Sequence, residues 1–226
     1  MSEGGGDLDR VYRVRFGEGE ARSKYELWTE VVAFLARWIP RDGAVLDVAC
    51  DRGYFIRNVH SRERWATDIR DMSAAFDGSV HFVQADALEL ASVLPKSHFD
   101  VAFMSNYLEH LSSSDAVLQQ FAQVRQVLKP GGRLIVLQPN IRFVGGAYWD
   151  FLDHKVALTD RSLGEAAEAS GFHVERMIPR LLPYTTKSRL PQHPLLVRAY
   201  LSFPPAWRVM GKQTLMVAMR PDDGSP

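Results

Sequence analysis

Short apolar runs alternate with amphipathic stretches along most of this chain. The runs have the length and composition of buried strands, and they fall at 44–48, 64–68, 80–84, 99–104 and 133–138. Apolar residues recur at three- and four-residue spacings in 22–38 and 115–128, which predicts two amphipathic helices. Strands that alternate with helices predict an α/β fold with a mostly parallel sheet.

The second half of the chain is expected to complete the same domain. A helix should begin at 159–162 and end at Ser170-Gly171, and strands are expected at 172–178 and 213–219. Between these strands, a short helix within 194–201 should end before Pro204-Pro205. The predicted organisation is an N-terminal tail with a possible lid at 1–21, one domain at 22–220 with an insertion at 179–212, and a tail at 221–226.

The loop after the first strand carries the first candidate chemistry. Asp47 lies near the end of the strand, and Gly53 follows in a tight loop that should lead into a short helix at 55–59. A glycine lets the backbone approach a ligand closely, and backbone N–H groups at a helix start point toward it. This segment therefore predicts a cradle for a polar ligand at the carboxyl end of the strand.

Three sequence motifs resemble those of class I S-adenosylmethionine-dependent methyltransferases. The first is the loop with Asp47 and Gly53, where Ala49 and Asp51 replace two of the family's glycines. The others are the Leu-Glu-His-Leu run at 108–111 and the Lys-Pro-Gly-Gly run at 129–132, so the resemblance covers 44–140. It implies a Rossmann-like seven-stranded sheet with an antiparallel last strand, helices on both faces, and S-adenosylmethionine as cofactor.

The cofactor residues follow partly from spacing and partly from the resemblance. Asp68 comes about twenty residues after the loop begins, which is where a βαβ unit places its ribose-binding carboxylate; a turn or N-cap role is the alternative. The resemblance implies that Asp86 holds the adenine amino group and that Asp51 meets the ammonium group. The expected cofactor-binding residues are Asp47, Ala49, Asp51, Gly53, Asp68, Asp86, Ala87 and Ser105.

Two histidines are candidates for a general base. His110 follows the fourth strand, beside the position that the resemblance implies for the methyl group, and the Asp153–His154 pair is the second candidate. Structural hydrogen bonding is the alternative for each. Asp150, Asp153 and His154 lack a recognisable metal-ligand spacing, so no metal is expected.

Aromatic and polar residues in the second half predict an acceptor site. The candidates are Tyr148, Trp149, Tyr184 and Lys187. The resemblance extends to bacterial methyltransferases of sugar or secondary-metabolite pathways, which implies O-methylation of a small molecule. The alternative is a catalytically inactive binding module, because Asp51 adds a charge and removes a glycine from the cofactor loop.

Composition and charge limit the classes of partner that the chain is expected to bind. The chain has 27 basic and 27 acidic residues, so it lacks the positive footprint of a nucleic-acid-binding protein. Its one cysteine, Cys50, forms no internal disulfide, is expected to be a buried filler, and fits the cytoplasm. No apolar run predicts a membrane span, and the polar N-terminus does not resemble a secretory signal. A homodimer remains open.

Overall fold

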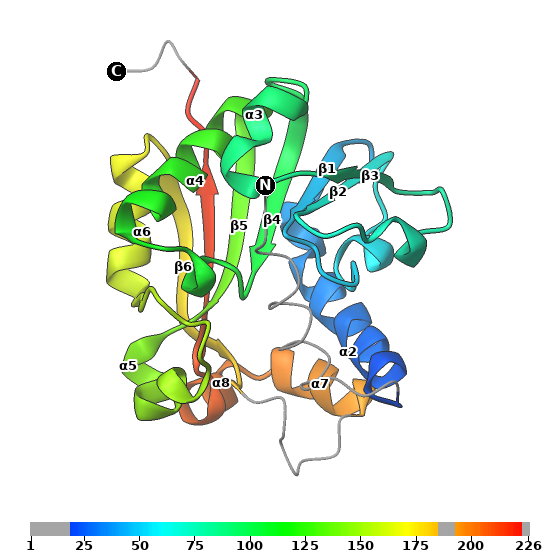
Figure 1. Ribbon diagram of the computed structural model, residues 1–226. Coiled ribbons are helices and arrows are strands. Elements are labelled where there is room, and N and C mark those ends of the chain that lie inside the picture. Colours follow the sequence, from blue (N-terminus) through cyan, green and yellow to red (C-terminus); the bar gives the residue numbers. More distant parts are fainter. Residues whose placement is uncertain (1–18, 185–192, 223–226) are drawn as a thin grey trace.

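The computed structural model describes residues 19–184 and 193–222, with side chains from Lys24 onward. Its centre is a seven-stranded sheet in the order β3-β2-β1-β4-β5-β7-β6 (Figure 1). The strands are β1 (Ala44–Val48), β2 (Glu63–Asp68), β3 (His81–Gln84), β4 (Phe99–Ser105), β5 (Leu128–Pro139), β6 (His173–Leu182) and β7 (Gln213–Met219).

The pairing of the strands confirms the predicted fold. β1 pairs in parallel with both β2 and β4, and β5 joins β4 in the same direction. β7 is antiparallel to both of its neighbours, β5 and β6. Because β1 to β5 run in one direction, their carboxyl ends meet at one edge of the sheet.

Helices cover both faces of the sheet. One apolar core lies under α3 (Leu90–Val93), α4 (Ser114–Val127) and α6 (Asp160–Ala169). The other lies under α2 (Gly19–Leu35) and includes residues of α7 (Pro194–Leu201) and α8 (Pro204–Met210). In Figure 1, α4 and α6 therefore lie across the sheet from α2. The remaining short elements are η1 (Ala36–Trp38), η2 (Ile56–Asn58), η3 (Ser73–Ala75), η4 (Ala87–Glu89), η5 (Leu108–His110), α5 (Ile141–Val144) and η6 (Gly145–Asp150).

Local sequence signals explain where the longer helices begin and end. The Ser113 side chain accepts the N–H of Ala116 at the start of α4. Thr159 and Ser162 form a capping box at the start of α6. Gly171 has a φ of +79°, the left-handed conformation that commonly follows a helix end. These signals confirm the predicted start and end of α6.

Two expectations need correction, and one helix was not expected. The helix expected after the first loop is only the 3₁₀ turn η2, so this loop has no long helix N-terminus behind it. Lys129 to Gly132, expected to separate helix from strand, already belong to β5. The helix expected within 194–201 is confirmed as α7, which ends before Pro204 and Pro205. These prolines also open α8, a helix that was not expected, because proline lacks the N–H that the first helical turn leaves unpaired.

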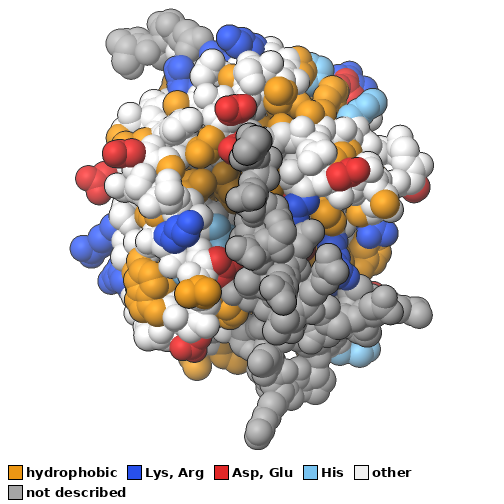
Figure 2. All heavy atoms as spheres, in the orientation of Figure 1, with side chains coloured by type: hydrophobic (Ala, Val, Ile, Leu, Met, Phe, Trp, Pro, Cys, Tyr) orange, Lys and Arg blue, Asp and Glu red, His pale blue; other side chains and the backbone are white. Residues whose placement is uncertain are grey.

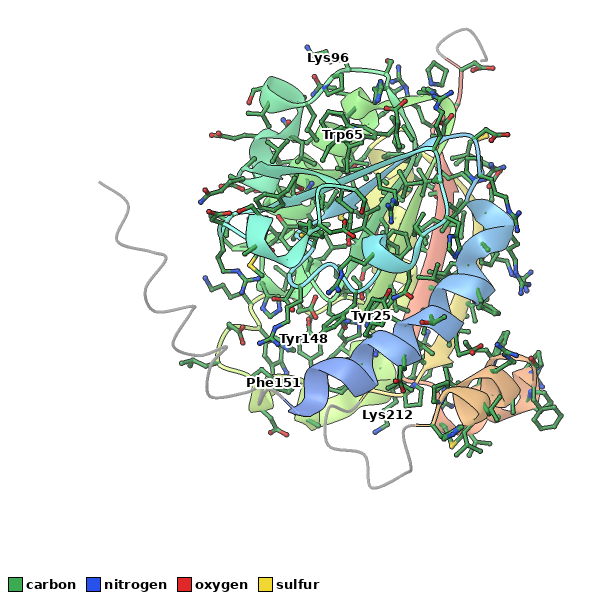
Figure 3. The ribbon with its side chains drawn as sticks, turned by 90° about the vertical axis from the view of Figure 1, so that its right-hand side faces the viewer. Tyr25, Trp65, Lys96, Tyr148, Phe151 and Lys212 are labelled. Carbon is green, nitrogen blue, oxygen red and sulfur yellow. The ribbon has the colours of Figure 1, made fainter. Side chains whose placement is uncertain are left out.

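The carboxyl edge of the sheet faces the loops after β4 and β5. Figure 3 shows Tyr148 and Phe151 at the same end of the molecule as Tyr25, with Trp65 and Lys96 at the opposite end. On the face in Figure 2, Lys and Arg side chains are interspersed with Asp and Glu. Among the described residues, no helix is long and apolar enough to cross a membrane.

Candidate functional site

The predicted cofactor residues meet at the carboxyl edge. The last residue of β1, Val48, is level with Thr67 of β2 and Met104 of β4. The loop after β1, the final Asp68 of β2 and the final Ser105 of β4 therefore lie side by side. This is the edge at which parallel α/β sheets bind their ligands.

The first loop has the backbone of a glycine-rich loop despite its substitutions. Ala49, Asp51 and Gly53 have φ values of +54°, +47° and +67°. At Gly53 a Cβ would lie 2.4 Å from Cε1 of Phe76, so a side chain there would both clash and be strained. Ala49 and Asp51 thus keep the left-handed backbone that favours glycine, although both residues carry side chains.

Asp47 is a buried acid beneath this loop. It is 3% exposed, the backbone of Ile56 hydrogen-bonds to it, and its Oδ2 has no partner among the described residues. Burial raises the pKa of Asp47 well above its usual value, and the nearby charges of Asp68 and Asp51 raise it further. An unpaired oxygen at this depth is the type of group that a polar ligand satisfies.

Arg70, which the sequence analysis did not select, connects two predicted cofactor residues. Its Nη2 donates to Oδ1 of Asp51 at 2.9 Å, and its Nε donates to Oδ1 of Asp68 at 3.0 Å. The backbone N–H of Asp51 also donates to Oδ2 of Asp68 at 2.9 Å. Arg70 therefore partly offsets the charge that Asp51 adds to the loop and holds Asp68 at the end of β2, while ribose binding by Asp68 stays a prediction.

The remaining cofactor candidates differ in their surroundings. Asp86 is exposed, and its Oδ1 accepts the N–H of Leu88 at 2.9 Å, which caps η4. Ala87 is buried in the core beneath α4. The Ser105 hydroxyl accepts a hydrogen bond from Asn106 at 3.0 Å. None of these contacts establishes an adenine site, so their cofactor roles stay predictions.

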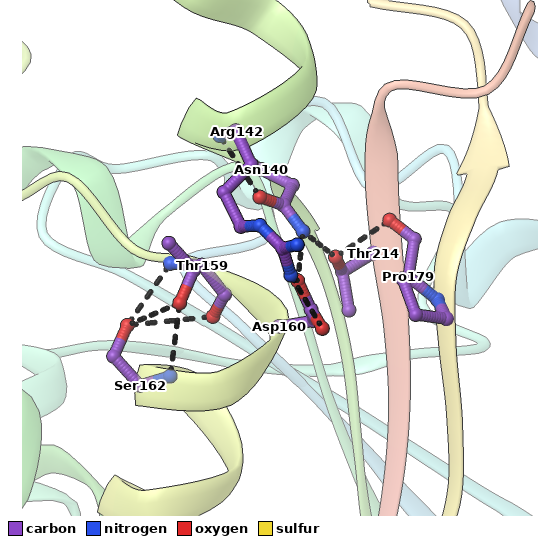
Figure 4. Close-up of polar contacts among 7 residues, drawn as sticks. All are labelled: Asn140, Arg142, Thr159, Asp160, Ser162, Pro179 and Thr214. Atoms are coloured by element: carbon purple, nitrogen blue, oxygen red, sulfur yellow. Dashed lines mark hydrogen bonds and ion pairs between the residues drawn. The ribbon is translucent and has the colours of Figure 1, made fainter.

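The loop after β5 is held closed by a polar network. Asn140 is 1% exposed, and its Nδ2 donates to Oδ1 of Asp160 at 2.8 Å and to Oγ1 of Thr214 at 2.9 Å (Figure 4). Arg142 adds an ion pair to Asp160 at 3.0 Å. Because these contacts join both ends of segment 141–159, they fix the base of the loop that carries the second histidine.

The two predicted bases lie in one cluster. His110 Nδ1 is 3.2 Å from the carbonyl oxygen of Asp153 and 3.2 Å from its Oδ2. The His110 and His154 rings meet edge to face, with centroids 5.1 Å apart. His154 Nδ1 lies 2.7 Å from the carbonyl oxygen of Tyr148. The structure thus joins His110 to the carboxylate that the sequence analysis had paired with His154.

Glu109 is the member of this cluster that the sequence analysis missed. It is 2% exposed, and burial raises its pKa above the usual value. The Gln138 amide lies beside Glu109 and acts to lower that pKa, but the geometry falls short of a hydrogen bond. The Leu-Glu-His-Leu run contains Glu109, but the sequence analysis used this run as a mark of the family and selected only His110 from it.

Only some of the residues expected to bind the acceptor lie at the surface. Tyr148 is fully buried, and its hydroxyl donates to the carbonyl of Val156, so its expected role in acceptor binding is corrected to one of packing. Trp149 is 55% exposed, and Tyr184 packs against Phe151 with ring centroids 6.1 Å apart. Lys187 lies outside the described residues.

A family model for the methyltransferase domain matches residues 20–176. This chain belongs to that family. The match confirms the resemblance to class I S-adenosylmethionine-dependent methyltransferases and the expected cofactor. It supports the enzyme over the inactive binding module, whose main argument is also weakened by the left-handed loop backbone and by the ion pair of Asp51 with Arg70.

Individual relatives agree with the family. The ubiquinone/menaquinone biosynthesis C-methyltransferase UbiE of Azotobacter vinelandii is 32% identical over 142 residues, 55% of this chain and 54% of that protein. The chain therefore spans about half the length of this relative. An S-adenosylmethionine-dependent methyltransferase structure from Mesorhizobium loti has a TM-score of 0.61 at 19% identity, covering 85% of this chain and 98% of that one.

A third comparison is with a geranyl diphosphate C-methyltransferase from Streptomyces coelicolor. Its structure has a TM-score of 0.60 at 17% identity and covers 84% of this methyltransferase and 77% of that chain. At such identities the two solved structures establish the fold alone. The residues of this methyltransferase fit the cofactor: the loop backbone is left-handed where glycines are usual, Asp68 ends β2, and Asp47 has an unpaired oxygen.

Proposed function

We propose that this methyltransferase transfers a methyl group from S-adenosylmethionine to a hydroxyl oxygen of a small acceptor, a sugar or a secondary metabolite. The contact of His110 with Asp153 carries this proposal. It supplies an oriented imidazole on the first turn after β4, at the edge where the cofactor loop lies. A hydroxyl acceptor needs such a base, because its proton must leave as the oxygen becomes a nucleophile.

The cofactor supplies a methyl group already activated by a positively charged sulfur, which keeps the bonding electron pair when the methyl group leaves. The loop residues 49–53 and Asp68 would hold the cofactor at the ends of β1 and β2. The task left to the protein is alignment of the acceptor, and holding the two reactants together supplies most of the acceleration.

His110 takes the proton of the acceptor in this proposal. Both oxygens near its Nδ1 are acceptors, so that nitrogen carries the proton and Nε2 presents its lone pair. The electron pair of the broken O–H bond then forms the new bond between oxygen and the methyl carbon. Asp153 acts as a positioning residue, because it fixes the tautomer of His110 and stabilises the imidazolium that forms.

C-methylation is the second candidate, and the similarity to UbiE favours it. An aromatic acceptor activated by a phenolic hydroxyl needs the same base, so the His110 site serves both reactions. Exposed Trp149 and the Phe151–Tyr184 pair provide apolar surface that suits a ring. The two candidates differ in the product, which is a methyl ether in one case and a C-methyl compound in the other.

The test begins with calorimetric titration of S-adenosylmethionine and S-adenosylhomocysteine, followed by a panel of sugars and phenols assayed for S-adenosylhomocysteine release. We expect both ligands to bind, and His110→Ala to lose turnover while keeping cofactor affinity. His60→Ala is the matched control, since His60 is an exposed histidine away from this edge. Unchanged turnover in His110→Ala contradicts the proposed base.

The setting of the reaction is part of the proposal. The single cysteine fits a reducing compartment, which favours the cytoplasm, and the balanced charge favours a small acceptor over nucleic acid. A homodimer remains a prediction, which light scattering of the purified protein tests directly.

A further inference from the structure

Three potential metal ligands converge at the carboxyl edge of the sheet. Glu109 and His110 belong to η5, directly after β4, and His154 belongs to the loop between η6 and α6. One ligand atom of each lies within 4.8 Å of the others. Glu109 and His154 are buried, and the His110 side chain is 23% exposed, so the cluster is closed on one side and accessible on the other.

The hydrogen bonds of the two histidines prepare them as ligands. His110 Nδ1 faces the carbonyl oxygen and Oδ2 of Asp153, and His154 Nδ1 faces the carbonyl oxygen of Tyr148. These oxygens only accept, so we infer that each Nδ1 carries a hydrogen, which leaves Nε2 as the nitrogen that can bind a metal. A second hydrogen bond of this kind to a carboxylate or carbonyl is the usual setting of a metal-binding histidine.

The carboxylate of the cluster is incomplete without a further group. Glu109 is 2% exposed, and its Oε2 has no hydrogen-bond partner among the described residues. Both amide atoms of the neighbouring Gln138 are also buried without a partner there. A buried carboxyl oxygen left without a partner is unfavourable, and a cation at this point would satisfy it. This observation is independent of the positions of the histidines.

We propose that Glu109, His110 and His154 bind one divalent transition-metal ion, of which Zn²⁺ is the representative, with an open position for the acceptor. Two imidazoles and one carboxylate form a donor set that suits Zn²⁺, Mn²⁺ or Fe²⁺, whereas Mg²⁺ and Ca²⁺ prefer oxygen ligands. The sequence analysis expected no metal because it considered Asp150, Asp153 and His154, and it did not select Glu109 as a ligand.

The ion would change the role of His110 in catalysis, and this consequence rests on the proposed function. An acceptor hydroxyl bound at the open position would have its pKa lowered by the positive charge, so its proton would pass to water. His110 would then be a ligand rather than the base. Asp153 remains a positioning residue in both cases, because it orients the same ring.

Metal binding can be measured without any methyl transfer. The chain is stripped with a chelator, its fold is checked by circular dichroism, and Co²⁺ is titrated while the visible absorption of a nitrogen- and oxygen-ligated site is followed; Zn²⁺ then displaces it. We expect one equivalent to bind, Mg²⁺ to compete poorly, and Zn²⁺ to raise the melting temperature. Glu109→Gln and His154→Ala should weaken affinity by at least about 100-fold, and Asp153→Asn by about 10- to 100-fold. His60→Ala should bind as the unchanged protein does.

Each outcome decides the proposal. A folded, stripped protein that binds neither Co²⁺ nor Zn²⁺ at one equivalent overturns it, as does Glu109→Gln binding with unchanged affinity while its fold is intact. Glu109→Gln keeps the size of the side chain, so it also guards against the collapse of a truncated variant. If the metal binds and no acceptor is methylated, the metal site stands and the proposed function fails. If the stripped protein still methylates at full rate, the proposed function stands and the catalytic role of the ion fails.

Discussion

Gly53→Ala should lower the free energy of unfolding, and the structure indicates two separate contributions to this loss. The first part is the left-handed backbone at φ +67°, which costs an alanine roughly 1–2 kcal/mol. The second part is the contact with Phe76, because the new Cβ would lie 2.4 Å from Cε1 and 2.8 Å from Cζ. Overpacking of this kind costs about 1–3 kcal/mol, so the total should be roughly 2–5 kcal/mol.

Gly131→Ala isolates the backbone part. Gly131 has a φ of +76°, but a Cβ there would meet no atom within 4 Å, and the residue lies near the start of β5, opposite the cofactor edge. We expect this variant to lose roughly 1–2 kcal/mol, or about 2–8 °C in melting temperature for a chain of this size. Its affinity for S-adenosylmethionine should not change.

Chemical denaturation and calorimetric titration of both variants provide the assay. Gly53→Ala should be the less stable and should bind S-adenosylmethionine more weakly, because the loop must shift to clear Phe76. The double variant Gly53→Ala/Phe76→Leu should recover part of the stability by removing the ring. Equal stability of Gly53→Ala and Gly131→Ala would refute the reasoning, since it would mean that Phe76 yields at no cost.

Three further predictions concern single side chains. Asp51→Gly should change the melting temperature by only a few degrees, because the relief of strain at φ +47° offsets a partly exposed ion pair with Arg70 that is worth about 0–1 kcal/mol. Its affinity for the cofactor should fall in a calorimetric titration, because a negative charge is lost and Arg70 is left to Asp68 alone; a rise would show that Asp51 weakens the site. Burial, followed by the charge of Asp47, raises the pKa of the Cys50 thiol, so a thiol reagent should label Cys50 only as the chain unfolds, and rapid labelling of the native protein would contradict this. Burial acts to raise the pKa of Asp160, but hydrogen bonds from Asn140 and Arg142 outweigh it, so the pKa is lowered. The contribution of Asp160 to stability is therefore present above about pH 4 and is lost as the pH falls through the folded pKa. Melting curves of Asp160→Asn and the unchanged chain should therefore converge toward acid pH; a gap that does not narrow would contradict it.

The sheet was predictable because its signals are local. β1 is an apolar run followed by a turn, and all five of its residues are buried, so the pattern alone identifies the strand. β7 was predicted with its exact bounds for the same reason. Boundaries failed where two local signals competed: the run of Lys129 to Gly132 contains turn residues, yet pairing with the neighbouring strand extends β5 back to Leu128.

The insertion at 179–212 is positioned by long-range contacts, which local sequence patterns do not predict. α7 was expected as a helix, but its place was not, because α7 is held by contacts with distant residues. The Arg198 guanidinium forms an ion pair with Glu30 of α2 at 2.8 Å, and Tyr200 donates its hydroxyl hydrogen to the carbonyl of Leu181 at 2.7 Å. Partners so far apart in sequence leave no periodic signal in either segment, so only the folded chain reveals that α7 packs beside α2.

The site combines both situations, which explains why the placement of His110 after β4 could be predicted while its contacts could not. His110 follows a strand that local pattern identifies, so its place at the carboxyl edge could be inferred. Its partner Asp153 lies in a distant loop. The hydrogen bond between Asn140 and Asp160 closes this loop by connecting the end of β5 with the start of α6. Without that closure, Glu109 is an acid in a helical turn; with it, the acid lies buried against two histidines. The same closure therefore supports both the proposed base for methyl transfer and the proposed donor set for a cation, and metal titration of the stripped protein separates the two.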